Sequence, residues 1–175
     1  SLDNLRQVFS HYDWQQGSVL DPNNVVQALE SCQAVFHLAA VVGVRRLMEN
    51  PENTHFQNLR GAEIVFEEAA RRGISIVFTS SSEIYGLGDG TPFLEEQASF
   101  DRLPNRPRFL YGKSKLQAEE KLKECANAFG VKARAVRLFN VIGPRQLSDY
   151  GMVVPRLIQQ ALAGTPMTVF GDGTQ

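Results

Sequence analysis

The chain has 175 residues, a formal net charge of −1 at pH 7, and 43% hydrophobic and 21% charged residues. This length is enough for one domain with a sizeable core, and the near-neutral charge gives no electrostatic basis for binding nucleic acid or a membrane surface. No run of about eighteen apolar residues occurs, so no transmembrane helix is predicted.

The two cysteines, Cys32 and Cys125, lie far apart in helical patterns. This usage fits a reducing compartment better than a disulfide framework, so we expect both to be buried hydrophobic side chains in a cytoplasmic protein. The histidines His11, His37 and His55 are scattered, so no metal site is predicted. His37 follows apolar residues and is expected to be a core histidine.

The first part of the chain alternates strands and helices. Residues 1–10 are expected to form a loop and a helical turn, and residues 12–16 a short strand. Asp21, followed by proline, is typical of a helix start, and the helix is predicted over residues 22–32. Residues 34–38 are predicted to be a buried strand. This strand–helix–strand order predicts a parallel sheet with helices on its faces.

The next part contains a long helix and a second strand. Residues 41–53 are predicted to be a loop, and residues 52–72 a helix that ends at Gly73 in the left-handed conformation. The apolar residues at helical spacing, which are expected to face the core, are Phe56, Leu59, Val65, Phe66, Ala69 and Ala70. Residues 74–78 form a predicted strand that leads into a row of hydroxyl side chains at 79–82.

The remaining elements follow the same order. Residues 87–110 are predicted to form a long loop, and loops of this length are usually functional. A helix is predicted over residues 111–129 and a strand over residues 132–139. A helix over residues 150–163 and a short strand over residues 168–171 complete the prediction.

Tyr111 and Lys115 are four residues apart, so both side chains leave one face of the predicted helix. An ammonium beside a phenol lowers the phenol pKa, and such a phenol can take a proton from a sugar hydroxyl as hydride leaves the carbon. Without other residues, the simpler interpretation of this pair is a solvated lysine beside a half-buried tyrosine. However, the hydroxyl row at 79–82 is predicted to lie at the carboxyl edge of the sheet, where ligands bind in open α/β folds.

Several motifs together make the chain similar to the extended short-chain dehydrogenase/reductase family, in its nucleotide-sugar epimerase/dehydratase branch. The segments that carry the resemblance are VFHLAA at 35–40, Asn50-Pro51 with Asn58 and Gly61, SSSEIYG at 80–86, YGKSK at 111–115, RLFN at 137–140, GPR at 143–145 and FGDGTQ at 170–175. The resemblance implies an α/β fold with a Rossmann-like doubly wound parallel sheet, NAD as the cofactor and a nucleotide sugar as the substrate.

The resemblance also implies roles for the catalytic candidates. Tyr111 takes the proton of the hydroxyl on carbon 4 of the hexose, Lys115 holds the nicotinamide ribose, and Ser81 orients the reacting oxygen. The resulting 4-keto sugar is then epimerised, dehydrated or decarboxylated. Glu83 resembles the acid/base of dehydratases and UDP-glucuronate decarboxylases, but a solvated loop glutamate is the alternative.

Further residues are implied to contact the ligands. The cofactor-binding candidates, besides Tyr111 and Lys115, are Ser18, Val19, Leu38, Ala39, Ala40 and Asn58. The substrate-binding candidates are Ser82, Asn140 and Val154. Ser18 stands where the family usually has an acidic residue, and an asparagine on the helix surface is the alternative for Asn58.

The family fold begins with a strand and a glycine-rich loop, yet no G-x-x-G-x-x-G occurs in this chain. We therefore expect a fragment that lacks this loop and most of the C-terminal substrate lobe. Residues 1–145 are expected to be part of the NAD-binding domain and residues 146–175 the start of the nucleotide-sugar-binding lobe. A homodimer through the two long helices is also expected.

The residues leave several alternatives open. Within the branch, they do not separate a UDP-glucuronate decarboxylase from a GDP-mannose 4,6-dehydratase type, nor do they give the nucleotide or the sugar. A simple NAD(P)-dependent reductase and a non-catalytic nucleotide-binding module are the alternatives from other classes.

Overall fold

The computed structural model describes residues 12–144, 146, 153–169 and 171–172. Its centre is a three-stranded parallel sheet in the order β1-β2-β3. The strands are β1 (Ala34–His37), β2 (Ser75–Ser81) and β3 (Ala133–Leu138). The predicted α/β organisation with a parallel sheet is therefore confirmed.

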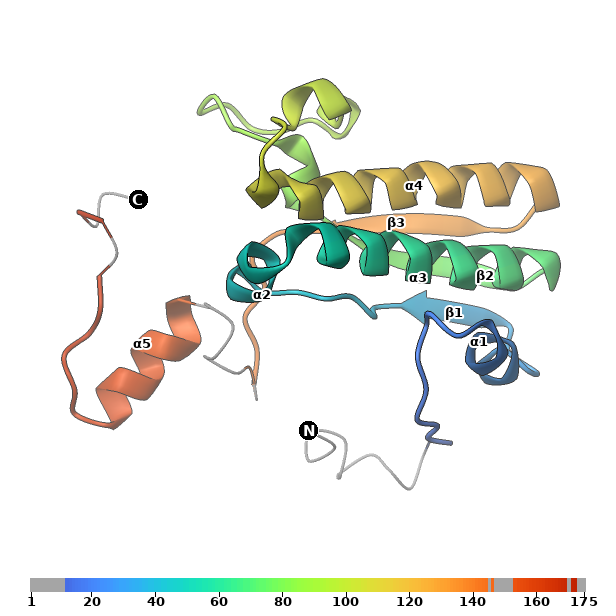
Figure 1. The fold of residues 1–175 in the computed structure, drawn as a ribbon, viewed down its shortest axis with the longest axis horizontal. Helices are drawn as coiled ribbons and strands as arrows, with labels where there is room; N and C mark the ends of the chain where they lie inside the picture. Colours follow the sequence, from blue (N-terminus) through green and yellow to red (C-terminus); the bar gives the residue numbers. More distant parts are fainter. Residues whose placement is uncertain (1–11, 145, 147–152, 170, 173–175) are drawn as a thin grey trace.

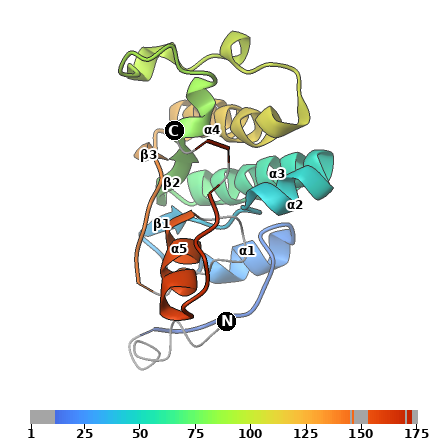
Figure 2. The ribbon, with the colours of Figure 1, turned by 90° about the vertical axis from the view of Figure 1, so that its left-hand side faces the viewer.

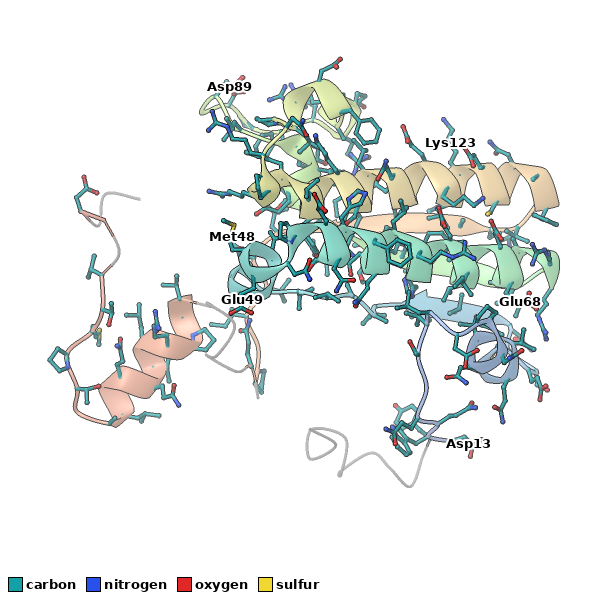
Figure 3. All side chains as sticks on the ribbon, in the orientation of Figure 1. Asp13, Met48, Glu49, Glu68, Asp89 and Lys123 are labelled. Atoms are coloured by element: carbon teal, nitrogen blue, oxygen red, sulfur yellow. The ribbon has the colours of Figure 1, made fainter. Side chains whose placement is uncertain are left out.

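Two long helices, α3 (Pro51–Arg71) and α4 (Leu110–Phe129), lie side by side over one face of the sheet (Figures 1 and 2). Because all three strands run in parallel, their carboxyl ends lie at one edge of the sheet. The short helix α2 (Val44–Glu49), which carries Met48 and Glu49, lies at this same end (Figure 3). This edge therefore gathers the segments that follow each strand.

The core lies between the sheet and the two long helices. Phe66 of α3 and Phe78 of β2 are almost fully buried, and their rings meet edge to face at 5.2 Å between centroids. His37 is also buried and packs against both rings, as expected of a core histidine. The stripe of apolar residues on α3 was predicted correctly except for Phe56, which is 60% exposed.

The helix starts follow local capping chemistry. Asp21 accepts a hydrogen bond from the backbone of Asn23 at 2.9 Å and begins α1 (Pro22–Ala28). The predicted end near residue 32 is wrong because the chain turns after Ala28 and Ser31 adopts a left-handed φ of 62°. At the end of α3, Gly73 has a φ of +72°, which confirms its predicted role.

The predicted loop at 41–53 is wrong because two helices meet there. Asn50 caps the second of them, α3, by accepting from the backbone of Asn53 at 3.2 Å, and Pro51 occupies the first helical position. Asn50 and Pro51, which are typical of loops, therefore mark only the break between α2 and α3.

Two predicted strands are also wrong. Residues 12–16 are not in a strand and pair with no described strand, and Tyr12 and Trp14 are exposed. Residues 168–169 are not in a strand, and Phe170 lies outside the described residues. The expectations for residues 1–10, Arg145 and residues 173–175 lie outside them as well.

Between β2 and α4 the chain forms short 3₁₀ helices in place of a simple loop. They are η3 (Ser82–Tyr85), η4 (Glu95–Gln97), η5 (Phe100–Arg102) and η6 (Pro107–Phe109). Helix η6 leads directly into α4 and thereby continues its helical path.

Three remaining expectations concern burial and the C-terminal part. Cys125 is buried as expected, but Cys32 is exposed. Helix α5 (Val153–Leu162) buries none of its described residues, so the domain boundary near residue 145 stays a prediction. In the part of the chain that the structure describes, no helix combines the length and apolarity needed to cross a membrane.

Candidate active site

A cavity of about 550 Å³ opens at the carboxyl edge of the sheet. Its walls come from the segments after β1 and β3, the end of β2, helix α2 and the start of α4. The predicted site residues that line it are Leu38, Ala40, Ser81, Glu83, Tyr111, Lys115 and Asn140. The cavity therefore lies where the hydroxyl row and the Tyr111 helix were predicted to meet.

Lys115 is almost fully buried at the base of this cavity, only 3% exposed. Its ammonium donates to the backbone oxygen of Thr79 at 2.8 Å and lies 4.7 Å from the centre of the Phe78 ring. Because burial penalises the charged form, the pKa of Lys115 falls from 10.5 to about 8. The fold thus holds a cation here at a cost in stability.

Tyr111 lies one helical turn before Lys115, and the Lys115 ammonium is 5.8 Å from the centre of its ring. Burial raises the pKa of Tyr111, a hydrogen bond with Ser81 lowers it, and the charge of Glu83 raises it. The predicted lowering of this pKa by Lys115 is therefore wrong for this structure. The physical reason is that desolvation dominates, while the ammonium is directed to the Thr79 carbonyl.

Ser81 ends β2 in an extended conformation and begins η3, where its hydroxyl accepts from the backbone N–H of Glu83 at 3.2 Å. Gly112 allows α4 to approach this turn closely. A Cβ atom on Gly112 would lie 2.8 Å from the Glu83 carbonyl oxygen. A glycine at this position is thus what lets Tyr111 reach Ser81.

Asn58 lies behind the cavity wall, 7% exposed on α3. Its side-chain oxygen accepts from the Val41 N–H at 2.7 Å and its amide donates to the Val41 carbonyl at 3.1 Å. Val41 lines the cavity, so Asn58 fixes the segment after β1. The alternative of a helix-surface asparagine is wrong.

The structure does not bring the other candidates into this cavity, whose described lining omits Ser18, Val19, Ala39, Ser82 and Val154. Ser18 accepts from the backbone of Leu20 at 3.2 Å, and Val19 packs against Gly61 of α3. Val154 is 45% exposed on α5. Their roles stay predictions from the resemblance.

Two polar residues that were not among the site candidates also line the cavity. Ser80 is 4% exposed, and its hydroxyl has no hydrogen-bond partner among the described residues. Arg108, on η6, also lines the cavity. It lies three residues before Tyr111 and seven before Lys115, a spacing that could have revealed it as part of the same helical face.

Arg137 of β3 was quoted in the motif, but its structural role was not predicted. It makes paired hydrogen bonds to Glu119 of α4, the shortest at 2.8 Å, and donates to the Tyr85 hydroxyl at 3.1 Å and to the Glu95 carbonyl at 2.6 Å. The bonds to Glu119 and, to a smaller extent, Tyr85 raise the pKa of Arg137. Tyr85 stacks near Phe139, which lines the cavity, so Arg137 joins the loop before α4 to one cavity wall.

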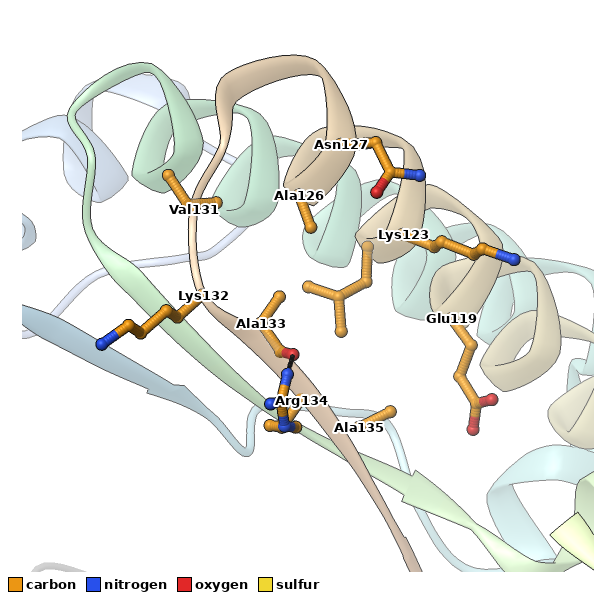
Figure 4. Close-up of a pocket in the computed structure, with 10 residues that line it drawn as sticks. Glu119, Lys123, Ala126, Asn127, Val131, Lys132, Ala133, Arg134 and Ala135 are labelled. Atoms are coloured by element: carbon orange, nitrogen blue, oxygen red, sulfur yellow. Dashed lines mark hydrogen bonds between the residues drawn. The ribbon is translucent and has the colours of Figure 1, made fainter.

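A separate cavity of about 490 Å³ lies between α4 and β3 (Figure 4). Glu119, Lys123 and Arg134 are among the residues that line it, together with small apolar side chains. None of the predicted site residues line this cavity.

Comparisons with known proteins identify the family of the chain. A sequence model of the NAD dependent epimerase/dehydratase family matches residues 2–175. A UDP-N-acetyl-alpha-D-glucosaminuronate decarboxylase of Bacillus cytotoxicus is 34% identical over 159 residues, which are 90% of this chain and 49% of that protein. UDP-glucuronic acid decarboxylase 1 of Xenopus tropicalis is 32% identical over 166 residues, 94% of this chain and 39% of that protein. The chain thus spans half or less of the length of these relatives.

Two solved structures share the fold. A dTDP-glucose 4,6-dehydratase of Streptomyces venezuelae with NAD bound superposes with a TM-score of 0.86 at 23% identity, covering 100% of this chain and 53% of that one. A UDP-glucuronic acid 4-epimerase of Bacillus cereus, in complex with UDP-glucuronic acid and NAD, gives a TM-score of 0.81 at 29% identity. The match covers 99% of this chain and 54% of that one.

Proposed function

The chain belongs to the NAD dependent epimerase/dehydratase family, and from this premise we propose that it oxidises the hexose of a nucleotide sugar at carbon 4. The observation that carries the proposal is that Ser81, Tyr111 and Lys115 line one cavity at the carboxyl edge of a parallel sheet. The product of this first step is a 4-keto sugar, whose later fate makes the enzyme an isomerase or a lyase.

NAD is the cofactor of this family, and the residues present fit it. The unpartnered, buried Ser80 hydroxyl and the Lys115 ammonium offer hydrogen bonds to a polar ligand. Small Ala40 leaves room beside them, and apolar Leu38 and Leu138 complete the lining. When bound, NAD supplies the acceptor for hydride from carbon 4 and returns that hydride later in the cycle.

The side chains of the cavity divide the proton chemistry. Tyr111 accepts the proton of the carbon 4 hydroxyl, and Ser81, hydrogen-bonded to Tyr111, orients the same oxygen. Lys115 presents its ammonium to the cofactor ribose. We propose that Asn140 at the end of β3 contacts the diphosphate of the substrate, because it lines the same cavity on the wall after β3.

Glu83 favours a second stage beyond simple epimerisation. It lines the cavity, and its charge adds to burial, the larger cause, in raising the Tyr111 pKa. A carboxylate in the same cavity as the base can move a proton at carbon 5 once carbon 4 is a ketone. A dehydratase or a decarboxylase is therefore the second candidate.

We also propose a cytoplasmic homodimer that pairs through α3 and α4. Phe56, an exposed aromatic side chain on α3, supports pairing through the two helices. The free thiols of Cys32 and Cys125 support a reducing compartment.

The test uses the complete protein with UDP-glucose, UDP-glucuronate, GDP-mannose or dTDP-glucose and a catalytic amount of NAD⁺. A product of unchanged mass but changed retention time identifies an epimerase, loss of water a dehydratase, and loss of carbon dioxide a decarboxylase. Tyr111→Phe should slow any turnover about 10²- to 10⁴-fold while NAD still binds. The matched control is Tyr12→Phe, because Tyr12 is 67% exposed. Equal turnover by both variants would contradict the role of Tyr111.

A further inference from the structure

The cavity wall after β3 begins where the pairing of the strands ends. Ser81, the last residue of β2, pairs with Leu138, the last residue of β3. Phe139 and Asn140 follow Leu138 and line the cavity. The ladder between β2 and β3 therefore does not fix the distance of this wall from Ser81, and other contacts have to hold it.

Tyr85 makes the contact that bridges this gap. It is 4% exposed and is the last residue of η3, the short helix that Ser81 caps. Its ring lies 6.3 Å from the Phe139 ring between centroids, and on Phe93 it stacks at 4.9 Å with the planes 8° apart. Tyr85 is thus joined to Ser81 through η3 and to the opposite wall through its ring.

The hydroxyl and the backbone of Tyr85 are both held by arginines. The Arg137 guanidinium donates to the Tyr85 hydroxyl at 3.1 Å, and its central carbon lies 5.3 Å from the centre of the ring. Glu119 accepts from the same guanidinium at 2.8 Å. Arg102 donates to the Tyr85 carbonyl at 3.1 Å. These bonds leave the Tyr85 ring little freedom to move relative to β3.

Tyr85 also lies outside the main core. It belongs to a separate cluster of buried apolar side chains, whose other members are Ile84, Leu103, Phe109 and Leu116. The larger cluster between the sheet, α1, α3 and α4 does not include it. A change confined to the Tyr85 hydroxyl therefore leaves the main core intact, and its effect on the cavity can be measured in a folded protein.

We propose that Tyr85, held by Arg137, is a positioning residue that sets the distance between Ser81 and the cavity wall after β3. The proposal deepens the proposed oxidation at carbon 4 and rests on it. The described lining of the cavity omits Tyr85, so Tyr85 acts through Phe139 and does not contact the substrate. A shift of this wall weakens substrate binding, while the reacting groups on α4 keep their place.

The experiment uses the complete protein with NAD⁺ and each of UDP-glucose, UDP-glucuronate, GDP-mannose and dTDP-glucose that the wild type turns over. KM and kcat are measured by product analysis for the wild type, Tyr85→Phe, Phe139→Leu and the double variant. Tyr85→Phe keeps the ring and removes only the hydroxyl that Arg137 holds. Tyr12→Phe is the matched control, because Tyr12 is 67% exposed. Val25→Ala is the control for stability, because Val25 is buried in the main core.

Tyr85→Phe is expected to raise KM for the nucleotide sugar about 3- to 10-fold, the size of one lost hydrogen bond, and to change kcat less than about twofold. In the Phe139→Leu background the same substitution should change KM less than about twofold, because the ring through which Tyr85 acts is gone. Tyr12→Phe and Val25→Ala should keep the wild-type KM at a temperature where urea unfolding shows them folded.

Three results would overturn the inference. An unchanged KM in Tyr85→Phe, or KM increases that multiply in the double variant, would refute positioning through Phe139 and leave oxidation at carbon 4 standing. A fall of kcat at constant KM would refute it as well, because the hydroxyl would then act on the chemical step. Absence of turnover by the wild type with all four substrates would refute the proposed function and the inference with it.

Discussion

Replacing Lys115 with methionine should stabilise the protein at neutral pH while abolishing its proposed activity. The fall of the Lys115 pKa from 10.5 to about 8 makes its charged form roughly 3 kcal/mol less favourable in the folded protein than in the unfolded chain. The substitution also removes the hydrogen bond to the Thr79 carbonyl, which costs about 1–3 kcal/mol. Lys115→Met should therefore raise the free energy of unfolding by about 1 kcal/mol at pH 7.

The pH dependence gives the sharper measurement. Between pH 8 and 10.5 the unfolded chain binds more protons at Lys115 than the folded protein does, so Lys115 makes the wild type more stable as pH rises. The advantage of Lys115→Met should therefore fall by roughly 3 kcal/mol across this window and change sign. The raised pKa values of Tyr111 and Cys125 have the opposite effect, but they are common to both proteins.

The assay is urea unfolding of the complete protein without NAD, followed by circular dichroism from pH 7 to pH 10.5. Lys123→Met serves as the control, because Lys123 is an exposed lysine on the same helix. A constant stability difference between Lys115→Met and the wild type across this range would refute the argument that burial depresses the Lys115 pKa.

Three further predictions concern the residues that shape the site. Gly112→Ala should destabilise the fold by about 1–3 kcal/mol and reduce turnover, because the added carbon meets the Glu83 carbonyl at 2.8 Å; urea unfolding and kcat measure the two effects, and an unchanged kcat would contradict the close-approach argument. Glu119→Gln should lower the free energy of unfolding by about 2 kcal/mol, because it weakens the paired bonds to Arg137. This loss is smaller than the loss from breaking a fully buried ion pair. Limited proteolysis within residues 87–109 should then become faster, and protection equal to wild type would count against Arg137 as the anchor of this loop. Asn58→Leu should cost about 1–3 kcal/mol by leaving backbone groups after β1 unpaired, and calorimetry should show weaker NAD binding; unaltered binding would separate Asn58 from the site.

The residues of the proposed catalytic group could be predicted because their geometry is local. Tyr111 and Lys115 share a helix face by spacing alone, and Ser81 follows a strand whose apolar pattern is clear. The sequence does not contain the burial that reverses the expected shift of the Tyr111 pKa. Whether the Tyr111 pKa rises or falls depends on which distant segments of the chain cover the phenol.

The errors in the fold prediction have a related cause. Residues 12–16 alternate as a strand does, but a strand also needs a partner, and no described strand pairs with them. Asn50 and Pro51 are typical of loops and of helix starts, and only the packing of α2 and α3 decides between the two. The sequence leaves Arg108 open between a loop arginine in solvent and a residue that faces a ligand, and only the continuation of η6 into α4 puts it on the helical path of Tyr111.

Three polar groups in one cavity differ from the residues that support its walls. Arg137 and Asn58, which support the walls, have their hydrogen bonds made within the protein. In contrast, the Ser80 hydroxyl is buried without a partner, Lys115 holds its charge against desolvation, and Arg108 has no described counter-ion, and all three line the same cavity. Folding gains nothing from leaving such groups unsatisfied, so their concentration is best explained by a ligand that satisfies them together. A ligand with ribose hydroxyls for Lys115 and an anionic group for Arg108 meets these requirements at once.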